Sequence, residues 1–102
     1  MNQEFADKNI EITKKINEKF QEAQGNIVHI EAQYLPDDWR RKSGSLSINA
    51  WYDNFPNTEH SFSRDSLLAI KEDRLITTDE VEEVFRRAKA ILVIEEARRN
   101  KR

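Results

Sequence analysis

Residues 76–102 read ITTDEVEEVFRRAKAILVIEEARRNKR, with no Gly or Pro in the whole stretch. Near its start, Thr77 and Glu80 have the spacing of a capping box, a common signature of a helix N-terminus. A helix over Thr78–Arg99 would be about 33 Å long, whereas a compact domain of this size has a radius of gyration of about 13 Å. The stretch therefore predicts a long helix that spans the whole domain.

This helix has two apolar faces. The first is an arc about 120° wide, typical of a face that packs on a core, and it comprises Val81, Val84, Phe85, Ala88, Ile91 and Leu92. The second lies on the opposite side, in the C-terminal half only, and comprises Ala90, Val93, Ile94 and Ala97. Either the first helix of the same chain covers this second face, or two copies meet there as a two-fold homodimer. The sequence leaves both explanations open.

Composition restricts the class of protein. The 102 residues, 37% hydrophobic and 35% charged, fit a single domain over residues 1–102. A net charge of -2 gives no overall basic field to attract nucleic acid or anionic membranes. The absence of Cys excludes disulfides, thiolate catalysis and cysteine zinc sites. With no apolar run long enough for a leader or a membrane span, we expect a cytoplasmic protein.

Two kinds of periodicity precede the long helix. Residues Asn2–Gln24 predict an amphipathic helix that ends at Gly25, with Asn9 inside its apolar arc. The core residues of that arc are Phe5, Ile12, Ile16, Phe20 and Ala23. After Gly25 the period changes to two, which is typical of half-buried strands. The expected core residues of two strands are Val28, Ile30, Ala32 and Tyr34, then Leu46, Ile48, Ala50 and Tyr52.

The remaining elements complete the predicted fold. The connection over residues 35–44 is too short for a crossover helix, so the first two strands should be antiparallel neighbours. A third short strand is expected at Glu59–Ser63 with Phe62 on the core face, followed by a short helix at Arg64–Arg74. The predicted fold is α+β: a small antiparallel three-stranded meander with helices packed on one face, in the order α-β-β-β-α-α.

The outward face of this sheet is the first candidate binding surface. The expected alternation places on it His29, Glu31, Gln33, Ser45, Ser47, Asn49, Trp51, Glu59 and Ser61, with no Lys or Arg. Ser and Asn are poor strand formers, and Trp51 would expose a large ring unless a partner covers it. The face is either a solvated polar surface or a shelf of hydrogen-bonding groups for a partner protein or a planar polar ligand.

The loop after the first strand is the second candidate surface. Trp39 is followed by Arg40 and Arg41, which could stack on a ring and hold a phosphate. Alternatively, Asp37 and Asp38 neutralise the two arginines. The terminal cations Arg98, Arg99, Lys101 and Arg102 could also bind phosphate, although the helix dipole accounts for their position.

Few residues support catalysis. With two glycines in the chain, no phosphate-binding glycine loop can form. His29 and Glu31 supply two metal ligands where zinc needs three or four, so we expect neither metal nor cofactor. His60 should lie at the core edge. An acid-base hydrolase would need His29, Glu31 and a third acid from Asp37 or Asp38.

The sequence thus favours a non-enzymatic adaptor or inhibitor that recognises another protein. Its expected contacts are the polar sheet face and the aromatic and basic loop, with a homodimer formed through the C-terminal helix as a further possibility. The alternative is a binder of a phosphate-bearing small molecule or nucleotide, with a Trp stacking and Arg clamping.

Overall fold

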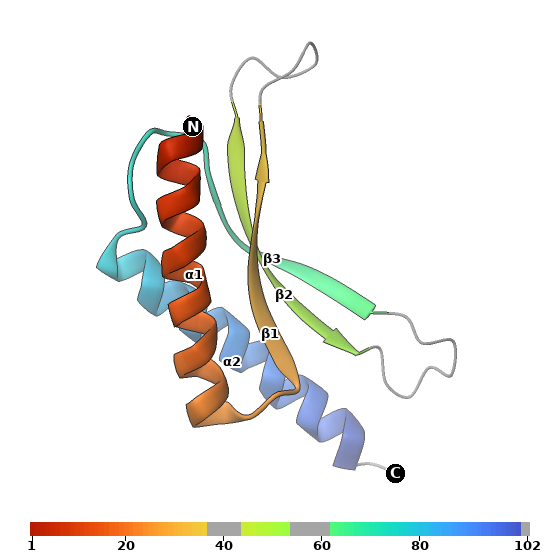
Figure 1. Ribbon diagram of the computed structural model, residues 1–102. Helices are drawn as coiled ribbons and strands as arrows, with labels where there is room; N and C mark the ends of the chain where they lie inside the picture. The colour runs from red at the N-terminus through yellow and green to blue at the C-terminus, as the bar shows by residue number, and fades with distance from the viewer. Residues whose placement is uncertain (37–43, 54–61, 101–102) are drawn as a thin grey trace.

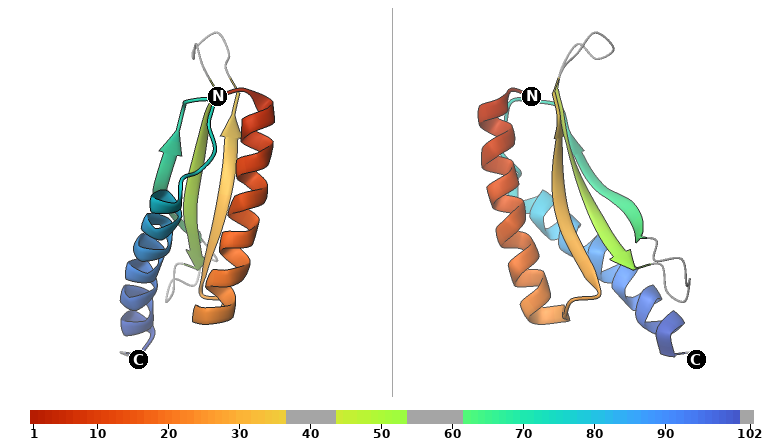
Figure 2. Two further views of the ribbon diagram at one scale, coloured as in Figure 1. Left: turned by 90° about the vertical axis from the view of Figure 1, so that its left-hand side faces the viewer. Right: turned by 45° about the vertical axis from the view of Figure 1, so that its right-hand side comes forward.

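The computed structural model describes residues 1–36, 44–53 and 62–100. Its elements are α1 (Gln3–Gln24), β1 (Val28–Leu35), β2 (Ser45–Asp53), β3 (Phe62–Ile70) and α2 (Thr78–Asn100). The strands form one antiparallel sheet in the order β1-β2-β3 (Figure 1). Both helices lie against the same face of this sheet (Figure 2). The predicted α+β meander is confirmed, with two helices in place of three.

Helix α1 begins and ends where the sequence predicts. The side chain of Asn2 caps it by accepting from the backbone N–H of Phe5. Gly25 ends it with a φ of 87°, a value that favours glycine. The buried face includes Asn9, which lies inside the predicted arc, but Ala23 at the end of that arc is exposed. The residues buried along α1 are Ala6, Asn9, Thr13, Ile16 and Phe20.

Buried Asn9 connects α1 to the segment between β3 and α2. Its amide nitrogen donates to the carbonyl of Arg74 at 3.0 Å, and its amide oxygen accepts from the N–H of Ile76 at 2.9 Å. A buried polar side chain is favourable only when its groups are bonded. Here the two bonds satisfy backbone groups of a segment that has no regular structure.

The N-terminus is held between the sheet and the same connecting segment. The amino group of Met1 donates to the carbonyls of Gly44 and Lys71, at 2.7 Å and 2.6 Å. The hydroxyl of Tyr34 donates to the carbonyl of Met1 at 2.6 Å. Gly44 fits closely into this arrangement, because a Cβ there would lie 2.5 Å from the Tyr34 hydroxyl and 2.7 Å from the Met1 oxygen.

Strands β1 and β2 pair as expected. Ile30 lies opposite Ala50, and Ala32 lies opposite Ile48. The inward residues on these strands that are fully buried are Val28, Ile30, Leu46, Ile48 and Ala50. The side chain of Asn17 on α1 also accepts from the backbone N–H of Ile30 at 2.8 Å, at the edge of the sheet.

Strand β3 differs from the prediction. Residues 62–70 form a strand where a short helix was expected from Arg64, and Phe62 is 69% exposed instead of facing the core. The pairing shifts between Ile48 and Asn49, so that Leu67 is an extra residue. This bulge lets both Leu67 and Leu68 pack toward the helices. Two adjacent apolar residues on one side do not fit the period of two of a regular strand, and they resemble the apolar face of a helix. On the outer edge, the Leu67 carbonyl accepts from Arg87 of α2 at 2.9 Å.

Helix α2 has the predicted N-terminal cap and the predicted inner face. Thr77 N–H donates to Glu80, and Glu80 N–H donates to the Thr77 hydroxyl. Val84, Ala88 and Leu92 are fully buried against the sheet side. The second apolar face is not covered by α1: Val93 and Ile94 are 54% and 59% exposed, and Ala90 and Ala97 are exposed too. Over the described ranges, neither helix combines the length and apolarity needed to cross a membrane.

We expect the cap of α2 to make stability dependent on acidic pH. The Arg74 guanidinium donates to both carboxylate oxygens of Glu80, at 2.6 Å and 3.0 Å, and together with the Thr77 bonds it lowers the pKa of Glu80 from 4.5 to about 2. Because the pKa is lower in the folded state, this stabilisation is complete above about pH 4.5 and is lost as the pH falls toward 2. Glu80→Ala should therefore cost about 1–2 kcal/mol near neutral pH and almost nothing near pH 2.

Urea denaturation of both proteins across this pH range measures the difference. Glu82→Ala, the same exchange at an exposed position two residues along α2, is the control and should change stability by less than about 0.5 kcal/mol at every pH. A Glu80→Ala cost that stayed constant across the range would show that the carboxylate charge is not responsible.

Candidate functional site

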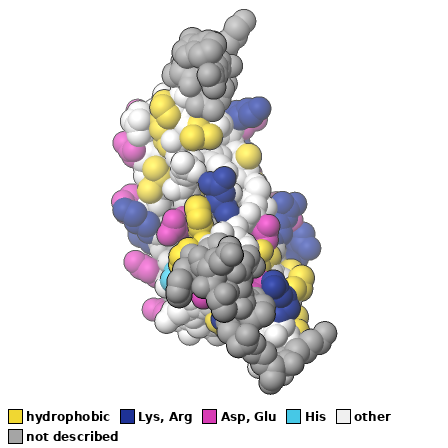
Figure 3. Space-filling view, turned by 90° about the vertical axis from the view of Figure 1, so that its right-hand side faces the viewer, with side chains coloured by type: hydrophobic (Ala, Val, Ile, Leu, Met, Phe, Trp, Pro, Cys, Tyr) yellow, Lys and Arg dark blue, Asp and Glu magenta, His cyan; other side chains and the backbone are white. Residues whose placement is uncertain are grey.

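The open face of the sheet gathers most of the residues singled out in the sequence. No described helix lies on this side, and Figure 3 shows acidic, basic and hydrophobic side chains interspersed on it. The strand register fixes three rows across the face. The rows are His29, Trp51 and Arg64; Glu31, Asn49 and Ser66; and Gln33, Ser47 and Ala69.

Trp51 and Arg64 form the centre of the face. They are cross-strand partners, and the guanidinium carbon of Arg64 lies 5.3 Å from the centre of the Trp51 ring. This distance is typical of a cation–π contact. Arg64 also reaches Gln33 on β1, with 3.5 Å between Nη1 and Oε1. The expectation that this face carries no Lys or Arg is therefore wrong, because it assumed that residue 64 begins a helix.

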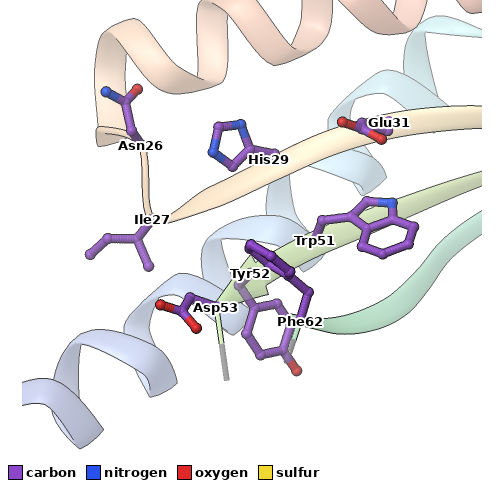
Figure 4. A pocket seen from close by; sticks show the side chains of 8 residues that line it. All are labelled: Asn26, Ile27, His29, Glu31, Trp51, Tyr52, Asp53 and Phe62. Carbon is purple, nitrogen blue, oxygen red and sulfur yellow. The ribbon is translucent and has the colours of Figure 1, made fainter. Parts of the chain in front are cut away.

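A hollow of about 480 Å³ opens at one end of the face (Figure 4). Its side chains come from the segment before β1, the start of β1, the end of β2 and the start of β3. Exposed Phe62 and half-buried Trp51 supply the apolar part, and the carboxylates of Glu31 and Asp53 supply negative charge. The full lining is Asn26, Ile27, His29, Glu31, Trp51, Tyr52, Asp53 and Phe62.

A second hollow of about 310 Å³ adjoins the first. Glu31 and Trp51 line both hollows and so form the wall between them. The other residues of the second hollow are Ala32, Gln33, Asn49 and Arg64. Trp51 is thus a ridge between two hollows. The first hollow contains the exposed ring of Phe62, and the second contains the amides of Gln33 and Asn49 and the guanidinium of Arg64.

Two polar side chains of the first hollow, His29 and Tyr52, are hydrogen-bonded to residues outside it. The amide nitrogen of Gln21 lies 2.6 Å from Nδ1 of His29, which connects that ring to α1. The hydroxyl of Tyr52 donates to Asp65 at 2.7 Å. Burial, followed by this bond, raises the pKa of Tyr52 to about 12. Tyr52 is therefore a neutral hydrogen-bond donor at physiological pH.

The residues that a metal site or the hydrolase hypothesis would need are only partly described. Within residues 1–36, 44–53 and 62–100, no three His, Asp or Glu side chains gather in a way that could hold a metal ion. His29 and Glu31 share the sheet face as expected. The third acid of the hydrolase hypothesis, Asp37 or Asp38, lies outside the described residues, as does His60.

The sequence predicted one part of this surface but not another. Of the residues predicted to bind a partner or ligand, His29, Glu31, Gln33, Ser47, Asn49 and Trp51 share the open face. Asn49 is only 5% exposed, and Ser47 donates to it at 3.3 Å, so this pair supports the surface more than it offers contacts. Trp39, Arg40 and Arg41 lie outside the described residues.

The missed residues are Phe62, Arg64 and Asp53, all near the β2–β3 end of the sheet. The alternation of β2 already placed Asp53 on the same side as Trp51, which was a usable signal. Phe62 and Arg64 could have been found only by extending the third strand through residue 70.

Comparison of the chain with protein-family models, curated proteins and solved structures found no match. Functional inference for this protein therefore depends on the geometry of its own surfaces.

Proposed function

We propose that this protein is a non-enzymatic adaptor or inhibitor that binds another protein through the open face of its sheet. The observation that carries the proposal is the ridge of Trp51 and Arg64 beside exposed Phe62, which is 69% accessible. Trp and Arg are among the residues that contribute most to protein interfaces. An exposed aromatic ring beside a preformed hollow, with a second aromatic ring next to it, is a combination typical of a binding surface.

The charges around the hollow indicate the chemistry of the partner. Glu31 and Asp53 are both exposed at the rim, and Asn26 adds a further polar group. A Lys or Arg side chain of the partner can lay its apolar stem over Phe62 and place its charge near these carboxylates. Arg64 already covers Trp51, so the partner's cation is expected on the Phe62 side of the ridge.

The geometry of the second hollow adds specificity. The amide of Gln33 and the guanidinium of Arg64 offer donors and an acceptor along its floor. Backbone groups or acidic side chains of the same partner can bond to them. Two recesses of different polarity on either side of one aromatic ridge would distinguish one partner surface from another.

We expect Phe62→Ser to weaken partner binding more than about ten-fold. Trp51→Ala should weaken it similarly, because it removes the ridge shared by the two hollows. Neither change should lower stability by more than about 1 kcal/mol, since Phe62 is largely exposed and the Trp51–Arg64 contact is on the surface. A partner captured by the wild-type protein, then titrated against each purified variant, gives the affinities.

The control is Leu75→Ser, which removes a 44% exposed apolar side chain from the segment before α2 and should leave the affinity unchanged. If the two sheet variants bind as tightly as the wild type, the open face is not the binding surface. A thermal-shift experiment with nucleotides tests the alternative function. If nucleotides raised the melting temperature, and if salt reduced this effect, the protein would be a phosphate binder and the proposal would be contradicted.

A further inference from the structure

Helix α2 carries an apolar stripe that no described part of the chain covers. It consists of Ala90, Val93, Ile94 and Ala97, and its two large residues are more than half exposed. In the left view of Figure 2, α2 lies beside α1 with the sheet behind, and no other element lies in front of its C-terminal half. Because the stripe lies on the side of α2 opposite to the buried residues Val84, Ala88 and Leu92, it faces away from the core and from the sheet.

The contacts between the helices leave this stripe free. Phe20 of α1 meets Phe85 of α2 with ring centres 6.0 Å apart, and Lys89 bonds to Gln24 at 2.5 Å. Both contacts come from the inner side or the flank of α2. A helix with apolar residues on opposite sides needs cover on both, and here the fold supplies cover on one.

We propose that a second copy of this chain covers the stripe, with the two α2 helices antiparallel across a two-fold axis between Val93 and Ile94. This inference depends on the spacing of the four residues. They are small, branched, branched and small, at intervals of 3, 1 and 3 residues, so the pattern is the same in both chain directions. In an antiparallel pair, Ala90 meets Ala97 of the partner subunit, and Val93 and Ile94 each meet their own counterparts. The alanines allow the helix axes to approach to roughly 8 Å.

Charge favours the antiparallel arrangement over the parallel one. The first turns of α2 are acidic, with Asp79 and Glu80, and its last turn contains Arg98 and Arg99. An antiparallel pair opposes the two helix dipoles, whereas a parallel pair aligns them and places the like-charged ends together. Lys89 and Glu96 also lie on the same flank of the stripe, seven residues apart, so each would face the other across the two-fold axis.

The arrangement has a consequence for binding that rests on the proposed function. Since the stripe and the open sheet face are on opposite sides of the protomer, a dimer would present two open faces pointing away from each other. Such a protein could bind two partners at once or bridge two sites on one assembly.

Sedimentation across about 1–100 µM protein tests the association, because a single pair of helices is a small interface with an expected Kd in the micromolar range. The wild type should pass from monomer to dimer over this range, and Ile94→Glu should stay monomeric with an unchanged fold, as its side chain is exposed. Leu75→Glu, a comparable exchange elsewhere, and Phe62→Ser should dimerise as the wild type does. A wild type that is monomeric throughout, or an Ile94→Glu protein that dimerises normally, would overturn the proposal.

Because the chain has no Cys, single cysteines report the orientation directly. In the antiparallel pair, Val93→Cys should form a disulfide with its own copy, since the two residues meet near the axis. Ala90→Cys alone should not, as the two copies would be about 10 Å apart along the helix, but a mixture of Ala90→Cys and Ala97→Cys should cross-link. Efficient self-linking of Ala90→Cys would exclude the antiparallel geometry, even if the protein were a dimer.

Phe62→Ser separates this inference from the proposed function. Loss of partner binding with dimerisation intact would support both, whereas loss of dimerisation in Phe62→Ser would contradict the placement of the interface on α2. Conversely, monomeric Ile94→Glu should bind the partner at each open face with unchanged intrinsic affinity.

Discussion

Asn9→Ala is expected to lower the free energy of unfolding by about 3 kcal/mol or more, because two buried backbone groups would lose their partners. The carbonyl of Arg74 and the N–H of Ile76 both bond to this side chain. Alanine is the better helix former, but that gain is only about 0.7 kcal/mol. Chemical denaturation gives the loss, and trypsin digestion under native conditions should show faster cleavage at Lys71 or Arg74.

Asn17→Ala is the matched control on the same helix. Asn17 accepts one bond, from the N–H of Ile30 at the sheet edge, so its replacement should cost only about 1 kcal/mol. It should leave the cleavage rate at residues 71–74 unchanged. Equal losses for the two variants would show that the buried bonds of Asn9 do not hold the connecting segment.

Gly44→Ala is expected to cost about 2 kcal/mol or more, for a steric reason. The new methyl group would lie 2.5 Å from the Tyr34 hydroxyl and 2.7 Å from the Met1 carbonyl oxygen. These atoms bond to each other, and the Met1 amino group bonds to the Gly44 carbonyl, so neither can move away without breaking a contact. Thermal and urea denaturation should both show the loss.

Two further variants identify the cause. Gly25→Ala meets no atom within 4 Å but must adopt a φ of 87°, so it should cost about 1 kcal/mol from backbone strain alone. Introducing Gly44→Ala into Tyr34→Phe should cost less than in the wild type, since the nearest clashing atom is gone. An equal cost in both backgrounds would exclude the hydroxyl as the source of the clash.

Periodicity was sufficient to predict most of the fold. The helices from residue 3 to 24 and from 78 to 100 have caps with a clear sequence signature, namely Asn2, Gly25 and the pair Thr77 and Glu80. Strands β1 and β2 alternate strictly, and this alternation fixed their faces and neighbours. In these segments, the secondary structure that the local sequence favours is also the one that tertiary packing requires.

Strand β3 is the part of the fold that periodicity does not predict. Its bulge places two consecutive leucines on the same side, which breaks the period of two and resembles a helix. The hydrogen bonds of Asn9 could not be predicted either, because its partners, Arg74 and Ile76, are more than 60 residues away in sequence. The bulge and the bonds of Asn9 both depend on contacts that no local sequence pattern records.

The candidate site was predicted to the extent that its strands were. Alternation placed Glu31 and Trp51 on the open face, and the structure brings them together in the wall between two hollows. Phe62 and Arg64 were missed because their strand was assigned to a helix. The surface that was expected to carry no Lys or Arg therefore has a cation, Arg64, against its central aromatic ring.

The bonds that Asn17 and Arg87 make at the two edges of the sheet affect how the protein can associate. One side chain from each helix bonds to the backbone of an outer strand, at Ile30 on β1 and at Leu67 on β3. An incoming strand from another chain would have to displace these bonds before it could extend the sheet. Growth by strand addition, the route to fibrous aggregates, is thereby hindered at both edges, and association is directed to the faces of the protein.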